Sequence, residues 1–161
     1  MRIPANYALM TSLFAVVVTA AGATTSTAVV SVSAVVGASC VIGSSPLAFG
    51  NYSGTSLDQT ASLTVLCTTG TPYTVALDNG TGTGATASLR RMTGPNNQTL
   101  AYNVYSDAAH TVSWASSSGV DTLAGTGTGS SQTIQAYGEI PAAQSPSPGA
   151  YNDTITVTLT Y

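Results

Sequence analysis

The sequence contains no lysine, and its only arginines are Arg2, Arg90 and Arg91. Charged residues make up only 6% of the chain, and the net charge is −3. Because a phosphate-binding surface needs clustered cations, this composition excludes DNA or RNA as the expected partner. A Schiff-base enzyme and a P-loop nucleotide-binding protein each need a lysine, so both classes are excluded as well.

Groups that carry catalysis or bind metals are equally scarce. His110 is the only histidine. Asp107 and Ser113 lie near it, but neighbours three residues apart on an extended chain do not converge into a triad. The six acidic residues are scattered at predicted turns and strand ends, not clustered as calcium ligands. We therefore expect a protein that is not an enzyme, with no cofactor and no metal, in which His110 is a loop residue.

The one long apolar run lies at the N-terminus. Arg2 precedes a mostly apolar stretch over 8–20, and Ala21-Gly22-Ala23 has the small-x-small form that signal peptidase cleaves. A transmembrane anchor is the alternative, but the run is too short and lacks a basic flank. We predict a signal peptide over 1–23, export of the remaining chain, and no membrane span after the signal is removed.

Two cysteines are present, Cys40 and Cys67. An even number of cysteines in an exported chain predicts a disulfide, and only one pairing can be formed here. Such a bridge stabilises a domain by roughly 3–4 kcal/mol. A zinc site is the alternative, but two isolated cysteines and one histidine provide too few ligands.

Period-two alternation of apolar and small polar residues is what the chain has in abundance. It predicts strands over 28–36, 61–67, 73–77, 99–105, 111–115, 132–140 and 151–161. Loops are predicted at 43–46, 80–84, 125–129 and 141–148, and Asn79-Gly80 suits a tight turn. Short strands separated by Gly, Ser and Thr turns indicate an all-β sandwich.

The first and last predicted strands are strongly one-sided. Ala28, Val30, Val32 and Ala34 form one apolar face, and residues 25–36 contain neither charge nor proline. Natural proteins usually blunt exposed strands with such residues, so this segment is predicted to pair with another chain. The last strand places Ile155, Val157, Leu159 and Tyr161 on one face and threonines on the other.

Four aromatic residues leave two interpretations open. Trp114, Tyr102, Tyr105 and Tyr137 could form a platform for stacking sugars. Packing in the core or on a strand face is the more common use of such side chains, and we favour it.

Several segments together resemble the spore coat protein U domain family, which includes subunits of archaic chaperone–usher pili. They are CVI at 40–42, LAFGNY at 47–52, LRRM at 89–92, LAYNVYSD at 100–107 with Trp114, YGEIP at 137–141 and GAYNDTITVTLTY at 149–161. The resemblance implies an incomplete immunoglobulin-like β-sandwich over 37–161, with six strands and the seventh missing. It also implies that residues 24–36 form a donor strand that fills the groove of the next subunit.

In such a mechanism, Ala28, Val30, Val32 and Ala34 would enter apolar pockets, and Ile155, Val157, Leu159 and Tyr161 would line the acceptor groove or its edge. Burial of two valines and two alanines would contribute about 5–8 kcal/mol before ordering costs. The implied partners are copies of the chain or sibling pilins, a periplasmic chaperone and an outer-membrane usher.

The expected function is therefore a structural subunit of a bacterial surface fibre that supports adhesion and biofilm formation. The expected location is the cell surface, reached through the periplasm. The alternatives are a spore or extracellular coat protein of the same fold and a glycan-binding adhesin module.

Overall fold

The computed structural model describes residues 17, 20–116 and 121–161, and divides the chain into two units, Met1–Val35 and Val36–Tyr161. The predicted signal peptide falls mostly outside the described residues. No helix in the described part of the chain is long and apolar enough to cross a membrane.

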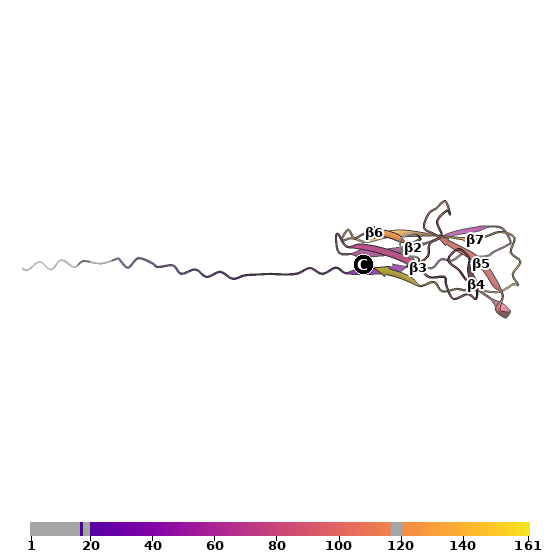
Figure 1. The fold of residues 1–161 in the computed structure, drawn as a ribbon, viewed down its shortest axis with the longest axis horizontal. Coiled ribbons are helices and arrows are strands. Elements are labelled where there is room, and N and C mark those ends of the chain that lie inside the picture. The colour runs from indigo at the N-terminus through magenta and orange to yellow at the C-terminus, as the bar shows by residue number, and fades with distance from the viewer. Residues whose placement is uncertain (1–16, 18–19, 117–120) are drawn as a thin grey trace, which may run out of the picture. The chain divides into compact units, whose positions relative to one another are not determined.

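Residues 20–39 form no strand, and their backbone is drawn as an extended trace in Figure 1. The strand predicted over 28–36 is therefore not formed in the single chain. A strand needs a hydrogen-bonded neighbour, and no described residue pairs with this segment. Its valines are exposed, from 83% at Val30 to 97% at Val35.

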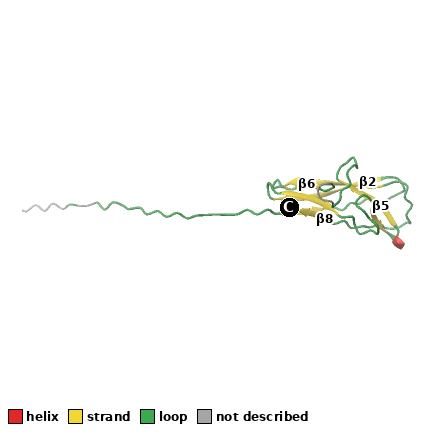
Figure 2. Cartoon of the chain, viewed as in Figure 1, coloured by secondary structure: helices red, strands yellow, loops and turns green. Residues whose placement is uncertain are grey.

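Two antiparallel sheets make up the second unit (Figures 1 and 2). The first sheet has the order β1-β2-β7-β5-β4, and the second has the order β6-β3-β8. The strands are β1 (Cys40–Ser44), β2 (Leu57–Cys67), β3 (Pro72–Leu77), β4 (Arg90–Thr93), β5 (Thr99–Tyr105), β6 (Leu123–Thr126), β7 (Gln132–Ile140) and β8 (Val157–Thr160). A short 3-10 turn, η1 (Pro95–Asn97), lies between β4 and β5.

The all-β class and the two-sheet sandwich are confirmed. The described residues hold eight strands where the resemblance implied six, and three of the eight, β4, β6 and β8, have only four residues each. The predicted strands 99–105 and 132–140 coincide with β5 and β7, and those over 61–67 and 73–77 lie within β2 and β3.

Four further predictions about elements are wrong. The loop predicted over 43–46 contains Gly43 and Ser44, the last two residues of β1. Residues 111–115 make only an isolated bridge, between Tyr105 and Ser113, because the Asp107 carboxylate accepts the Thr111 and Val112 backbone N–H groups. The last strand is limited to Val157–Thr160. The loop predicted over 125–129 contains the end of β6, where Gly125 leaves room for the Tyr73 ring.

The core is built from the inward faces of both sheets. It includes Leu63 and Val65 of β2, Val75 and Leu77 of β3, and Val104 of β5. Alternation along each strand places these side chains inside and their neighbours outside.

Trp114 is fully buried, and its Nε1–H donates a hydrogen bond of 2.9 Å to the Val75 carbonyl oxygen. Tyr102 is also buried. The packing interpretation is therefore confirmed for these two residues, which cannot form part of an exposed sugar platform.

Candidate functional site

Each sheet ends in two edge strands, β1 and β4 in the first sheet and β6 and β8 in the second. β1 ends the first sheet and β8 ends the second, and the two strands lie close to each other. Unpaired edges present backbone N–H and C=O groups that can accept another strand.

The inward face of β8 is apolar and incompletely covered. Val157 and Leu159 pair in register with the buried Leu77 and Val75 of β3, yet are themselves only half-buried. Thr158 and Thr160 point the other way and are exposed. On the facing edge, Ile42 of β1 is half-buried and packs against the same core.

A cleft of about 220 Å³ lies next to these edges, between the segment that follows β1 and the segment that precedes β8. Leu47 and Phe49 line one side, and Tyr151 and Ile155 line the other; Met92, Tyr102, Asn152 and Asp153 complete it.

Gly138 of β7 allows the segment after β1 to lie directly on the sheet. A Cβ atom added at Gly138 would lie 2.7 Å from Leu47 Cδ2 and 2.8 Å from Phe49 Cζ. Phe49 also meets Tyr102 edge-to-face, with ring centroids 6.0 Å apart. The wall of the cleft therefore depends on the absence of a side chain at Gly138.

Asp153 forms the polar end of the cleft. Its carboxylate accepts hydrogen bonds from the Tyr102 hydroxyl at 2.7 Å and from the Thr81 N–H and hydroxyl at 2.7 and 2.8 Å. Burial tends to raise the pKa of Asp153, but these hydrogen bonds and that of the Thr154 N–H outweigh it and lower the pKa. Burial raises the pKa of Tyr102. The carboxylate thus anchors the chain before β8 and has little capacity left for proton transfer.

The structure brings together three of the predicted groove residues, Ile155, Val157 and Leu159, and all three pack against the core while staying half-buried. Tyr161 lies beyond the end of β8 and is 58% exposed. The predicted donor residues Ala28, Val30, Val32 and Ala34 belong to the first unit and are exposed.

Sequence reasoning did not name the other wall of the site. Ile42, Leu47 and Phe49 come from β1 and the segment after it. The alternation of Leu47, Ala48 and Phe49 was a visible signal, but it could not show which residues these side chains would face.

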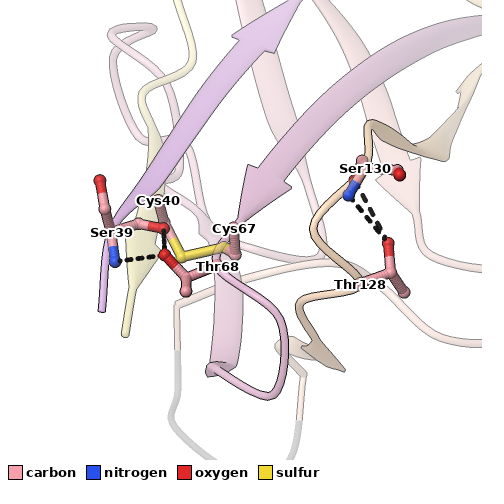
Figure 3. Close-up of a disulfide and its surroundings, with 6 residues drawn as sticks. All are labelled: Ser39, Cys40, Cys67, Thr68, Thr128 and Ser130. Atoms are coloured by element: carbon pink, nitrogen blue, oxygen red, sulfur yellow. Dashed lines mark hydrogen bonds between the residues drawn. A yellow bond between two sulfur atoms is a disulfide. The ribbon is translucent and has the colours of Figure 1, made fainter. Parts of the chain in front are cut away.

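The predicted disulfide joins Cys40 and Cys67, which are also paired residues of β1 and β2 (Figure 3). Beside it, the Thr68 hydroxyl accepts a hydrogen bond from the Ser39 N–H at 3.2 Å and lies 3.3 Å from the Ser39 carbonyl oxygen, to which it donates. The disulfide and Thr68 thus fix the point at which the chain enters β1.

The residues near His110 do not form a triad. The Asp107 carboxylate binds the Thr111 and Val112 N–H groups, whereas the His110 ring stacks on Tyr105 with centroids 4.8 Å apart. His110 Nδ1 lies 3.8 Å from Glu139 Oε2. This histidine lies in a loop, as predicted.

The fold is that of an antiparallel β-sandwich in which the edge strands β1 and β8 lie next to each other, and comparison with known proteins gives its family. The chain belongs to the Spore Coat Protein U domain family, whose model matches residues 26–158. It is 34% identical over 121 residues to Protein U of Myxococcus xanthus, covering 72% of this chain and 67% of that protein.

A solved structure has a similar fold. It is a chaperone–tip adhesion subunit pre-assembly complex from the archaic chaperone-usher Csu pili of Acinetobacter baumannii. The match has a TM-score of 0.58 and 21% identity, and covers 77% of this chain but 40% of that chain. The chain therefore spans less than half the length of this structural neighbour.

Proposed function

We propose that this protein is a structural subunit of a bacterial surface fibre, a pilus, which polymerises by donor-strand complementation. The observation that carries the proposal is the presence, in one chain, of two complementary features. One is the pair of open edges with half-buried apolar side chains on β1 and β8. The other is the uncharged, exposed apolar segment 24–36.

The periodicity of the two features matches. Ile155, Val157 and Leu159 recur at every second residue, as do Ala28, Val30, Val32 and Ala34. Strands rise about 3.3 Å per residue, so both sets of side chains repeat at the same spacing. An inserted strand would bond to the open edges through its backbone and bury its apolar face, the mode known as β-strand addition.

A donor supplied by a neighbouring copy makes a head-to-tail contact. Such a contact uses different surfaces on the two copies, so it does not close on itself and propagates as a filament. Gly37, Ala38 and Ser39 separate the donor segment from β1, where the Cys40–Cys67 disulfide holds the strand. Force on the donor strand would thus be transmitted to the sheet.

The proposal includes a chaperone and an usher as partners. An open apolar edge invites aggregation until a neighbour covers it, so a periplasmic chaperone would occupy the groove first. The pre-assembly complex with which the chain shares its fold pairs a chaperone with a pilus subunit. Residues 1–23 would direct export, an outer-membrane usher would assemble the fibre at the cell surface, and the fibre would support adhesion and biofilm formation. The role is structural, without catalysis.

The family relationship also favours a second candidate, a spore or extracellular coat protein. The matching family model is named for a spore coat protein. A coat would use the same strand exchange, so the two candidates differ in where the polymer is deposited. Electron microscopy of the cells that make the protein distinguishes them, because one predicts surface fibres and the other a layer on spores or matrix.

The deciding experiment removes residues 24–34 and co-expresses the shortened chain with a periplasmic chaperone of this class. We expect the variant to bind the chaperone but to form no heat-resistant polymers on gels and no fibres by electron microscopy. Normal polymerisation of this variant would overturn the proposal.

Matched substitutions test the donor register. Val30→Asn and Val32→Asn would place amides in the apolar pockets and are expected to stop polymerisation. Val29→Asn, on the opposite face of the same segment, is the control and is expected to polymerise. If Val29→Asn stopped polymerisation while the other two variants polymerised, the donor register would differ by one residue from the one proposed. If all three variants polymerised equally, this segment would be excluded as the donor.

A further inference from the structure

A second cleft, of about 320 Å³, lies on the outer face of the first sheet. Its lining consists of Asp58, Gln59 and Thr60 of β2, Tyr137 of β7, and Ala108 and His110 from the loop after β5. No lining residue belongs to β1 or β8, so this cleft is separate from the proposed strand-acceptor groove. Tyr137 points outward because its neighbours Ala136 and Gly138 are the buried positions of β7.

The strand register gathers polar groups beside this cleft. One row across β2, β7 and β5 contains Asp58, Glu139 and Asn103. The next row contains Thr60, Tyr137 and Tyr105. Residues directly opposite on neighbouring strands have Cβ atoms about 4.5–5.5 Å apart, so two carboxyl groups, one amide and two phenols share one small surface.

The loop that overhangs the cleft is held in place by its own contacts. The Asp107 carboxylate accepts the Val112 N–H at 2.8 Å, and the Ser106 N–H donates to the Val112 carbonyl oxygen at 3.0 Å. His110 stacks on Tyr105 at an interplanar angle of 18°. One wall of the cleft is therefore preformed.

Glu139 supports the same arrangement from the sheet. Its carboxylate accepts hydrogen bonds from the Tyr105 hydroxyl and from the Ser56 hydroxyl, both at 3.2 Å. His110 Nδ1 approaches the same carboxylate at 3.8 Å. Glu139 is therefore engaged in positioning Tyr105 and His110.

Three polar side chains that line the cleft are, in contrast, unengaged. Asp58, Thr60 and Tyr137 make no side-chain hydrogen bond with any residue in the described ranges. The carboxylates of Asp78, Asp107 and Asp153 are all bonded to N–H or O–H groups. Asp58 and Tyr137 thus present a free carboxylate and a free phenol to whatever enters the cleft.

We infer that this outer cleft binds a neutral saccharide. A carboxylate accepts strong hydrogen bonds from hydroxyl groups, and a tyrosine ring offers an apolar face with a polar tip, which suits the alternating C–H and O–H groups of a sugar ring. One carboxylate, that of Asp58, and no lysine or arginine lines the cleft, so an anionic sugar would be repelled. A preformed concave site with a few directed polar groups is the usual form of a small-ligand site.

The inference goes beyond the proposed polymerisation and does not depend on it, because the two sites use different strands. If the chain does form fibres, each copy would carry one such cleft. Many weak sites on one fibre would then bind a polysaccharide with high avidity.

The test uses the purified full chain and isothermal titration calorimetry. The probes are cellohexaose, N-acetylchitohexaose and maltohexaose, with trigalacturonate as the anionic counterpart. We expect at least one neutral hexasaccharide to bind and trigalacturonate not to bind. Tyr137→Ala and Asp58→Asn should each weaken binding about tenfold or more, as expected for loss of a hydrogen bond to a charged group or of a stacking partner.

Thr64→Ala is the matched control, since Thr64 is exposed on the same outer face of β2 but does not line the cleft. It is expected to bind as the unmodified chain does. Failure of all three neutral probes to bind, equal binding of trigalacturonate, or equal binding by the Asp58→Asn variant would overturn the inference. Polymer formation by each variant, assayed in parallel, keeps this result separate from the test of the proposed function.

Discussion

Arg90 is fully buried and makes no ion pair with any residue that the structure describes, which is unusual for a side chain that is almost always charged. Its Nε and Nη2 donate to the Asp78 carbonyl oxygen at 3.0 and 2.8 Å, Nη1 donates to Ala87 O, and Nη2 also donates to Trp114 O. Burial lowers the pKa of Arg90, while the nearby Tyr102 and Asp78 oppose that shift. One guanidinium thus connects three loops through their carbonyl groups.

Replacement of Arg90 is expected to destabilise the domain severely. In Arg90→Leu, the buried Trp114 carbonyl oxygen and the part-buried Asp78 and Ala87 carbonyl oxygens lose their donor. At about 1–3 kcal/mol each, the free energy of unfolding should fall by about 3 kcal/mol or more. Urea denaturation followed by tryptophan fluorescence measures the change, because Trp114 is one of the connected residues. Arg91→Leu, at the neighbouring half-buried position, is the control. A loss as small as that of the control would show that the guanidinium network does not stabilise the fold.

Asp153 and Asp78 make stability depend on pH. Burial tends to raise both pKa values, but hydrogen bonds outweigh it and hold each below the ordinary value of 3.8. At pH values between the lowered pKa of these carboxyls in the folded chain and their ordinary pKa in the unfolded chain, the unfolded chain binds more protons. The free energy of unfolding therefore rises with pH in this range. The contribution of the two carboxylates to the free energy of unfolding is fully present above about pH 4. It is lost as the pH falls through their lowered pKa values in the folded chain.

We expect the free energy of unfolding to decline below about pH 4, and to decline less steeply in Asp153→Asn. Urea denaturation at a series of pH values measures the slope. Asp58→Asn is the control, since this exposed carboxylate makes no hydrogen bond with the described residues. If Asp153→Asn kept the slope of the unmodified chain, Asp153 would not be a source of the acid sensitivity.

At the scale of elements, the strands that sequence analysis located correctly are those that alternate along their whole length. β5 alternates buried and half-buried residues from end to end, β7 alternates along its length with its second half buried on one face, and the predicted bounds of both match the structure. β4 was missed because Arg90 lies inward, where alternation analysis expects an apolar residue. The strand predicted over 111–115 is not formed, because the Asp107 carboxylate accepts hydrogen bonds from backbone N–H groups that a strand would use for pairing.

The candidate site likewise could be predicted only where it depends on local alternation. The inward residues of β8 follow from alternation alone. The facing wall depends on Leu47 and Phe49 lying against Gly138, more than 85 residues further along the chain, and no local pattern encodes that contact. The outer cleft likewise depends on the register that places Asp58, Glu139 and Asn103 in one row.

Gly138→Ala should disturb the wall of the acceptor cleft. The new methyl group would overlap Leu47 and Phe49, and such overpacking costs about 1–3 kcal/mol. Gly43→Ala, in β1, is the control because a Cβ there meets nothing within 4 Å. Thermal unfolding of both variants measures the difference. Equal melting temperatures would mean that the 47–49 segment moves aside without cost.

At the scale of the whole molecule, the proposed mechanism gives each chain one donor and one acceptor, and these can be disabled separately. A chain without residues 24–34 keeps its acceptor. Val157→Asp keeps its donor but places a carboxylate in the acceptor groove, where an unpaired charge is costly to bury.

Neither variant is expected to polymerise alone, but a mixture of the two should form a one-to-one dimer that grows no further. Size-exclusion chromatography with light scattering identifies this dimer. Thr158→Asp, on the exposed face of the same strand, should polymerise normally. Absence of the dimer, or growth of long polymers from either variant alone, would contradict head-to-tail strand exchange.

The burial of Arg90 has a further consequence for survival outside the cell. Trypsin-like proteases cleave only after lysine or arginine, and this chain has no lysine. After removal of residues 1–23, Arg90 and Arg91 would be the only cleavage sites, and they are adjacent in β4, one fully buried and the other half-buried. The folded domain therefore offers proteases of this class almost nothing to cut.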